Sequence, residues 1–175
     1  ETIRIRNLID DCQGGKISIP EFQRDYVWKK KKAPLLIDSL FRNYPVSSLL
    51  IWQDSSDDVR SRRKALRQVR GLANWLIDGQ QRVSTLTKCR NGNEGIDVVV
   101  HPERLEFMLA NAATKGDRNW FHLSELWDDD GWRQTRQNLD LDGSRGHSRI
   151  AVFDKVREIL SREIPVVRMV DHSFA

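Results

Sequence analysis

Short apolar runs alternate with amphipathic stretches along the chain, and no internal repeat or Pro/Gly/Ser-rich linker divides it. The runs at 48–52 and 74–77 are too short for helices and too continuous for exposed strands, so they predict adjacent buried strands. Three-and-four spacing of apolar residues over 34–42, over 83–87 and over 150–161 predicts helices. The pattern therefore predicts an α+β fold, with a mixed β-sheet flanked by helices.

The remaining elements follow from the same patterns. An opening helix over 3–12 is expected to end at Gly14, and further strands are expected at 17–19, 96–100 and 165–170, with 105–109 as a hairpin partner of 96–100. The expected core residues are the large apolar ones of these elements: Leu36, Leu40, Leu50, Ile51, Leu76, Ile77, Leu86, Val156 and Leu160.

The domain organisation is predicted from the region in which apolar residues become sparse. The polar stretch 111–149 is expected to be an insertion into a single domain whose core is formed by 1–110 and 150–175. Because the pattern breaks off directly after a predicted strand, the chain is expected to be an N-terminal piece of a longer protein.

Composition narrows the class of protein. Hydrophobic residues make up 39% of the chain and charged residues 31%, which is typical of a globular domain with a heavily charged surface. No run of 18 apolar residues and no apolar signal-peptide core is present, so neither a membrane span nor secretion is expected. Cys12 and Cys89 lack C-x-x-C spacing, which argues against a structural zinc site or a disulfide scaffold and favours a reducing cytoplasm.

Basic residues are unevenly placed, although the formal net charge is only +4. One run covers 29–32. A second, between 60 and 70, is rich in arginine, which suits bidentate phosphate contacts. One interpretation is a basic face for DNA, and the other is a solvated helix or loop face; the residues alone do not decide between them. The residues that would contact DNA are Arg60, Arg62, Arg63, Lys64 and Arg67.

The segment 75–86 carries the clearest candidate chemistry. An apolar strand ends in Asp78-Gly79, and a helix begins directly after it, so free backbone N–H groups and the positive end of the helix dipole form a ready anion site. Arg82 on the first helical turn could reach the same anion, and Asp78 could hold a metal ion or orient a water. The alternative is that Asp78 only caps the helix while the following polar side chains are solvated.

A second segment, 19–28, places Gln23 and Arg24 among aromatic residues between a predicted strand and a predicted helix. It could present a guanidinium beside stacking surfaces. The alternative, which composition alone favours, is that the aromatic residues anchor a loop and Arg24 pairs with an acid.

The two segments together resemble a known family. The motifs Pro20-x-Phe22-Gln23-Arg24-x-Tyr26-Val27-Trp28, Leu49-Leu50-Ile51-Trp52 and Ile77-Asp78-Gly79-Gln80-Gln81-Arg82 are similar to those of domain-of-unknown-function family 262, the N-terminal domain of GmrSD-type modification-dependent restriction enzymes and related phage-defence proteins. The resemblance implies a ParB/sulfiredoxin-like fold. It also implies nucleotide binding and hydrolysis in this domain, with DNA recognition and cleavage elsewhere in a longer protein.

Carried onto this chain, the resemblance implies a nucleoside triphosphate with a divalent cation such as Mg²⁺ as cofactor. Its catalytic residues would be Asp78, Gln81 and Arg82, with Asp78 as metal ligand, and its nucleotide-binding residues Gln23, Arg24, Gly79, Gln80 and Arg82. The implied partners are DNA and a separate nuclease domain; self-association stays open. The family's Phe-x-Arg-x-Asn motif is expected after the last predicted strand, beyond Ala175, and the four histidines are scattered without the spacing of a His-Asn-His nuclease.

Two functions are therefore expected to compete. One is a nucleoside triphosphatase domain that licenses a restriction-type nuclease. The other is a non-catalytic DNA-binding module that uses the basic segment 60–70, whose phosphate contacts would make binding steeply salt-dependent. A weaker third possibility is a protein-interaction domain in which the charge runs serve only solubility.

Overall fold

The computed structural model describes residues 1–20, 28–54, 73–92 and 96–170, and it confirms the predicted α+β class with a mixed sheet. The chain forms two compact units. The first comprises Glu1–Val27, Val46–Val83 and Glu163–Ala175, and the second comprises Trp28–Pro45 and Ser84–Arg162. The first unit is thus discontinuous in sequence.

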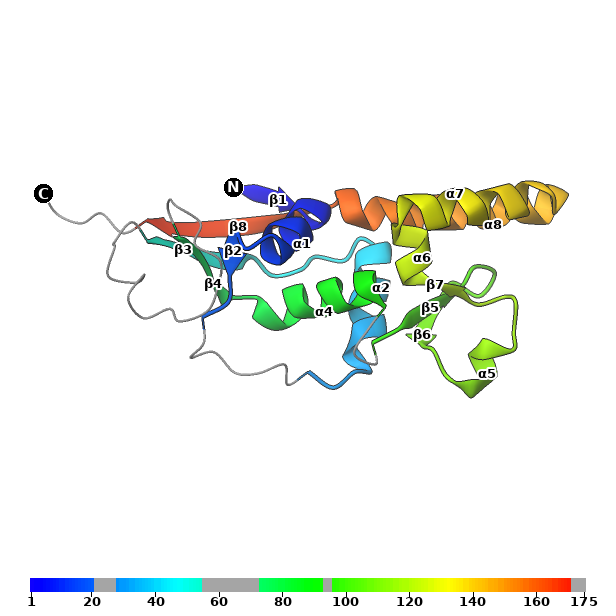
Figure 1. The fold of residues 1–175 in the computed structure, drawn as a ribbon, viewed down its shortest axis with the longest axis horizontal. Helices are drawn as coiled ribbons and strands as arrows, with labels where there is room; N and C mark the ends of the chain where they lie inside the picture. The colour runs from blue at the N-terminus through cyan, green and yellow to red at the C-terminus, as the bar shows by residue number, and fades with distance from the viewer. Residues whose placement is uncertain (21–27, 55–72, 93–95, 171–175) are drawn as a thin grey trace, which may run out of the picture. The chain divides into compact units, whose positions relative to one another are not determined.

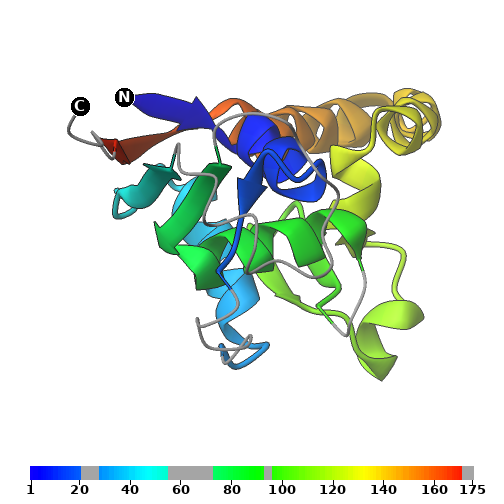
Figure 2. The ribbon, with the colours of Figure 1, turned by 60° about the vertical axis from the view of Figure 1, so that its left-hand side comes forward.

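The first unit is built on a five-stranded sheet with the strand order β1-β8-β3-β4-β2. β3 pairs antiparallel with β4 and parallel with β8, so β8, β3 and β4 lie side by side in both ribbon views (Figure 1, Figure 2). β1 is antiparallel to β8, and β2 is parallel to β4. The strands span β1 (Thr2–Arg4), β2 (Ile17–Ser18), β3 (Leu49–Asp54), β4 (Ala73–Asp78) and β8 (Glu163–Val170). The predicted adjacency of the 48–52 and 74–77 strands is confirmed.

Helix α1 (Ile5–Gln13) follows β1 and buries Ile5, Leu8 and Ile9 completely. The first half of β8 buries alternate residues, as a strand with one covered face does, whereas β4 buries the consecutive residues Trp75 and Leu76. In β8, Ile164 and Val166 are buried, whereas the side chain of Val167, on the other face of the strand, is half exposed. Ile164 and Val166 of β8 therefore face the core of this unit.

The prediction of nine core residues is wrong at two positions. Leu50 and Ile77 are only partly buried, while their strand neighbours Ile51 and Leu76 are fully buried. For Leu50 the reason is the alternation of strand side chains, which points it away from the face that buries Leu49 and Ile51. Ile77 shares a face with the buried Trp75 but lies at the end of β4, next to the exposed Asp78. The other seven are buried: Leu36, Leu40, Ile51, Leu76, Leu86, Val156 and Leu160.

The second unit contains a three-stranded antiparallel sheet in the order β6-β5-β7. β5 (Val98–His101) and β6 (Glu106–Leu109) form the predicted hairpin, and β7 (Phe121–His122) pairs on the other side of β5. Its helical elements are α2 (Lys32–Phe41), α5 (Ala112–Lys115), α6 (Leu123–Trp127), α7 (Asp129–Asp140), α8 (Gly143–Glu158) and η1 (Ile159–Ser161). Helix α4 (Gln80–Asn91) begins in the first unit and continues into the second.

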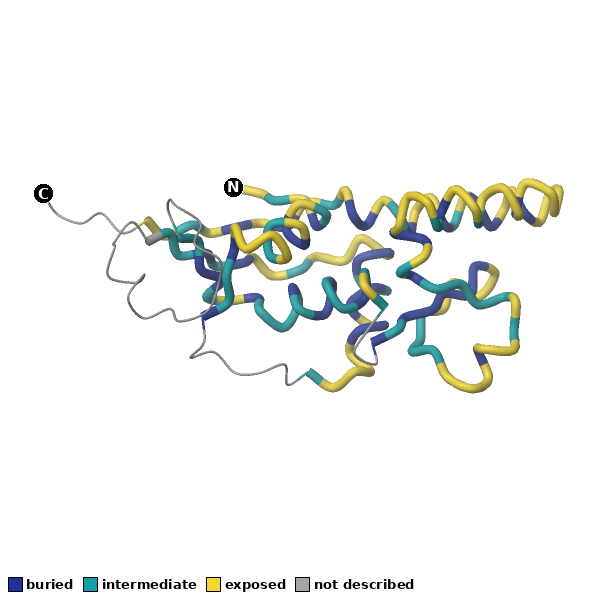
Figure 3. The backbone as a smooth tube through the Cα atoms, viewed as in Figure 1, coloured by how far each residue is buried: buried dark blue, intermediate teal, exposed yellow. Residues whose placement is uncertain are grey.

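The polar stretch 111–149 is folded as helices α5, α6 and α7 and the start of α8. α7 and α8 pack against each other (Figure 1). At Gly146 the two helices approach so closely that an added Cβ would overlap the Leu139 carbonyl oxygen. Much of α7 and the first part of α8 is exposed (Figure 3), so a few apolar anchors such as Trp132 and Leu139 hold the pair. Within the ranges given above, the helices are too short or too polar to cross a membrane.

Candidate functional site

The candidate site is the turn between β4 and α4. Asp78 is the last residue of β4, Gly79 has a φ of +96°, and Gln80 is the first residue of α4. The Val83 N–H donates to the Gly79 carbonyl oxygen over 3.0 Å, which makes Gly79 the N-cap of the helix. The structure thus forms the strand–turn–helix arrangement on which the predicted anion site depends.

Glycine at position 79 is required by packing as well as by the backbone. A positive φ is readily adopted by glycine and is costly for residues with a Cβ. In addition, a Cβ on Gly79 would overlap Leu49 Cδ2 and lie 3.2 Å from Arg82 Nη2. The space beside this residue is therefore filled by the protein's own side chains.

Arg82 reaches from α4 to the backbone that precedes β3. Its Nη1 donates to the Ser47 carbonyl oxygen and its Nη2 to the Ser48 carbonyl oxygen, the latter over 2.9 Å. The side chain is only 16% exposed, and burial lowers the pKa of Arg82, while the charge of Asp78 acts in the opposite direction. In this structure Arg82 ties the start of α4 to the start of β3.

Asp78 is the exposed charge of the turn. Its side chain is 71% exposed, and Oδ2 lies 3.7 Å from Arg82 Nη2. In the sheet, Asp78 pairs with Leu50, next to an irregularity in the β3–β4 register between Leu50 and Ile51. Such irregularities re-aim side chains at the end of a strand pair. The carboxylate is thus accessible to a ligand from solvent.

Of the other predicted site residues, Gln80 and Gln81 lie half-buried on the first turn of α4. The motif 78–82 is therefore gathered in one turn. The predicted nucleotide-binding residues Gln23 and Arg24, and the predicted DNA-binding residues Arg60, Arg62, Arg63, Lys64 and Arg67, lie outside the described residues. Because β2 and β4 are parallel, the carboxyl end of β2 points in the same direction as the carboxyl end of β4, where Asp78 lies.

A divalent cation was expected at Asp78. Among the residues that the structure describes, no three or more His, Cys, Asp and Glu side chains are grouped closely enough to hold a metal ion. One accessible carboxylate nevertheless fits Mg²⁺ that arrives with a nucleotide, because Mg²⁺ at phosphates keeps several waters and takes only one or two carboxylates. The donor set therefore fits a cation carried by phosphates and does not fit a cage made by the protein alone.

Two features of the polar chemistry have no counterpart in the sequence prediction. The acceptors for Arg82 are the backbone carbonyls of Ser47 and Ser48, and no pattern of side chains in the sequence predicts them. The second unit also holds a cluster around the buried Arg149, in the stretch interpreted as an insertion. The signal that could have found it is the spacing of Arg145 and Arg149, which are one helical turn apart.

The model of one protein family, described as the GmrSD restriction endonuclease N-terminal domain, matches residues 5–167. The chain belongs to this family. The resemblance predicted from the motifs is thereby confirmed, and the match extends beyond them through the helices of the second unit.

A relative of this GmrSD N-terminal domain is the uncharacterized protein MJ0686 of Methanocaldococcus jannaschii, which is 28% identical over 98 residues. The alignment covers 49% of this chain and 16% of that protein. The chain thus corresponds to a small part of the relative's length.

Proposed function

We propose that this domain binds and hydrolyses a nucleoside triphosphate, and that its nucleotide state licenses DNA cleavage by a separate nuclease domain in a restriction or phage-defence system. The observation that carries the proposal is the turn at 78–80, where an exposed carboxylate, a left-handed glycine and the first turn of a helix follow one another. Membership of a restriction endonuclease family supports the coupling to a nuclease and to DNA.

The start of α4 would bind the phosphates. The helix dipole favours negative charge at this end, and the backbone N–H groups of a first helical turn point towards an anion bound there. Gly79 sets the direction of the helix relative to β4 through its positive φ. Phosphoryl transfer needs positioning and charge stabilisation more than covalent help from the protein, so this arrangement suits it.

Asp78 and Arg82 would have different roles. When a divalent cation is bound with the nucleotide, it supplies charge neutralisation on the phosphates, and Asp78 is the residue that would hold it. Arg82 donates to two backbone carbonyls, so we propose that it acts chiefly by holding the turn in shape. Gln81, with Gln80 beside it, would orient the attacking water.

Gln23 and Arg24 complete the proposed site by resemblance to the family. The chain leaves β2 at the sheet edge that carries Asp78, which is consistent with their contributing to the same site. Arg24 would then supply the positive charge at the phosphates, because the guanidinium of Arg82 donates to backbone carbonyls instead. The basic segment 60–70 stays a predicted contact for DNA.

Calorimetric titration of ATP and GTP, with and without Mg²⁺, tests the proposal. We expect saturable binding that depends on Mg²⁺, and a loss of about tenfold or more in affinity in Asp78→Asn. Asp140→Asn, on the exposed surface of α7, is the control and should bind like the parent. Absence of nucleotide binding, or equal binding in both variants, would reject the proposed site and leave the DNA-binding alternative.

A further inference from the structure

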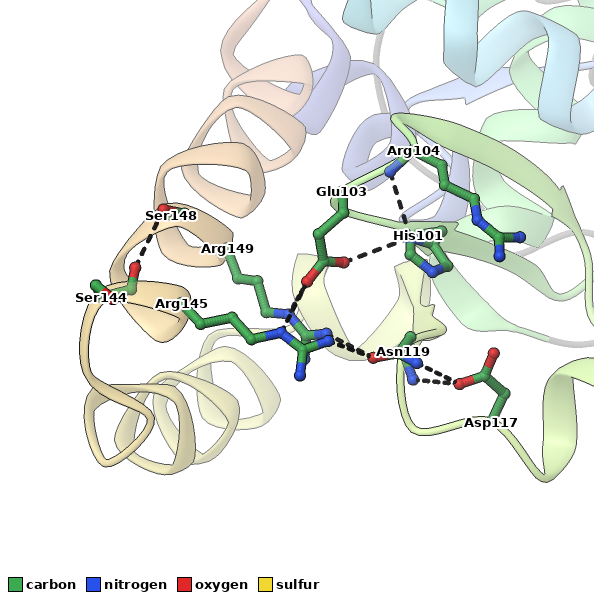
Figure 4. Close-up of polar contacts among 9 residues, drawn as sticks. All are labelled: His101, Glu103, Arg104, Asp117, Asn119, Ser144, Arg145, Ser148 and Arg149. Carbon is green, nitrogen blue, oxygen red and sulfur yellow. Dashed lines mark hydrogen bonds and ion pairs between the residues drawn. The ribbon is translucent and has the colours of Figure 1, made fainter.

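The second unit contains a cluster of two arginines around one carboxylate and one amide (Figure 4). Glu103 Oε1 accepts from Arg149 Nε over 2.7 Å and from Arg145 Nε over 3.2 Å. Asn119 Oδ1 accepts from Arg149 Nη2 over 2.6 Å and from Arg145 Nη2 over 2.9 Å. Both guanidinium groups therefore share the same two oxygen atoms. We call Glu103, Asn119, Arg145 and Arg149 the two-arginine cluster.

The two arginines differ in exposure. The Arg149 side chain is 7% exposed, and its guanidinium lies over the Phe121 ring, 5.5 Å from the ring centroid. The Arg145 side chain, one turn earlier on α8, is 63% exposed. Arg149 is thus fixed in place by packing, while Arg145 lies at the solvent side of the cluster.

The charges of the cluster do not balance. Glu103 supplies one negative charge to two guanidinium groups, and its second oxygen, Oε2, lies 3.4 Å from His101 Nδ1. Asp117 accepts from the Asn119 backbone N–H over 2.9 Å and from Asn119 Nδ2 over 2.7 Å, so its charge acts on the arginines only through the Asn119 amide. Like charges held this close repel each other, and because the two guanidinium groups share the single carboxylate of Glu103, the group of three side chains keeps a net positive charge.

Donors are also left over. Each guanidinium uses Nε and Nη2 for Glu103 and Asn119, and an arginine carries five N–H donors. Neither Nη1 donates to any other residue in the described part of the chain. The two guanidinium groups share the same two acceptors, so each keeps an Nη1 group that can donate to a further acceptor.

We propose that the two-arginine cluster is a binding site for a phosphate group, from a nucleic-acid backbone or a free nucleotide. Paired guanidinium forks match the geometry and charge of a phosphate. The buried Arg149 alone is sufficient to link α8 to the 101–119 segment through Glu103 and Asn119. The exposed Arg145 adds a second positive charge that repels Arg149, and a bound anion would reduce this repulsion. The site uses none of the residues of the 78–82 turn, so it goes beyond the proposed nucleotide hydrolysis and can fail independently of it.

Titration of the ¹⁵N-labelled chain with inorganic phosphate, monitored at the arginine Nε–Hε resonances, tests this site. We expect saturable shifts at Arg145 and Arg149, and an affinity about tenfold lower in Arg145→Ala. The matched control is Arg133→Ala, because Arg133 is similarly exposed, at 69%, and its one ion pair among the described residues is with Asp130 on its own helix. Absence of shifts, or equal weakening by the two variants, would overturn the proposal.

A second variant should raise the affinity for phosphate, whereas Arg145→Ala should lower it. Glu103→Gln keeps an oxygen that can accept from both arginines but removes the negative charge that competes with phosphate. A phosphate site should then bind several-fold more tightly, even though the folded chain is less stable. A purely structural cluster would lose stability with no gain in phosphate affinity, which would overturn the proposal.

Competition distinguishes the two sources of phosphate. A short DNA duplex and ATP are each added to the phosphate-loaded chain. Displacement by the duplex at the lower concentration identifies a backbone contact, and the slope of log affinity against log salt should then fall by about one in Arg145→Ala. Displacement by ATP at the lower concentration identifies a nucleotide site. Displacement by neither would overturn the proposal that the cluster serves a biological phosphate.

Discussion

Gly79 and Leu49 lie so close that a methyl group on Gly79 would overlap Leu49 Cδ2. Gly79→Ala should therefore lower the free energy of unfolding by about 2–4 kcal/mol, the sum of a left-handed conformation and an overpacked contact. Chemical denaturation measures this. Gly15→Ala is the control, since Gly15 also has a positive φ but open space around it. Equal losses in both variants would show that the contact with Leu49 contributes nothing.

Substitutions at Asp78 and Arg82 should affect different properties: Arg82→Ala chiefly the stability of the fold, and Asp78→Ala chiefly the proposed hydrolysis. Arg82→Ala leaves two backbone carbonyls without their donor, so we expect a loss of about 1–3 kcal/mol in unfolding free energy. Asp78→Ala removes an exposed side chain and should change stability by no more than about 0.5 kcal/mol. If Asp78 serves hydrolysis as proposed, Asp78→Ala should still lower the hydrolysis rate by roughly 10³-fold. A paired measurement of thermal unfolding and phosphate release checks both; a stable Arg82→Ala variant would contradict the role given to Arg82.

The α7–α8 pair should depend on Gly146. A Cβ there would overlap the Leu139 carbonyl oxygen, a backbone atom that cannot rotate away. Gly146→Ala should cost about 3 kcal/mol or more, against a helix-propensity gain of about 1 kcal/mol. Hydrogen exchange of α7 and α8 amides reports the change. Gly116→Ala, where the structure leaves room for a methyl group, should exchange like the parent chain.

Stability should fall in acid partly through Glu103. Burial raises the pKa of Glu103, but hydrogen bonds from Arg149 and Arg145 outweigh it, so the folded-state pKa lies below the ordinary value of 4.5. A depressed pKa contributes stability that is present above that value and is lost as the pH falls through the folded-state pKa. Urea unfolding between pH 7 and pH 3 should show a smaller acid loss in Glu103→Gln than in the parent. An unchanged pH profile would mean that these hydrogen bonds do not form in solution.

The sheet of the first unit could be predicted from sequence because its central strands are marked by hydrophobicity. Ser48–Trp52 and Asn74–Ile77 were found by their apolar runs, and both are strands in the structure. Helix α7 could not be found in this way. It buries only Trp132 and Leu139 among its 12 residues, so the apolar period on which prediction depends is hardly present.

The site was predicted in part for a related reason. The motif 78–82 is contiguous, and an apolar strand followed by Asp-Gly and a helical pattern shows the turn directly. The partners of Arg82 could not be predicted, because Ser47 and Ser48 contribute backbone carbonyls and lie 34 or 35 residues away. Contacts of this kind depend on the tertiary structure and leave no pattern in side-chain types.

The pairing of β3 with β8 also sets an order of assembly during synthesis. Leu49 pairs with Val166, so β3 leaves the ribosome long before the strand that will lie beside it. Residues 84–162, the larger part of the second unit, can complete contacts among themselves during this interval, since they lie between these two strands in the sequence, and the other part of the unit, 28–45, precedes β3. Until β8 emerges, β1 and β3 each lack a neighbour and expose a strand edge, which is the kind of surface that joins to other chains. The sheet that carries Asp78 is therefore completed only when Glu163–Val170 has been made, and we expect nascent chains that stop short of this strand to aggregate more readily than chains that include it.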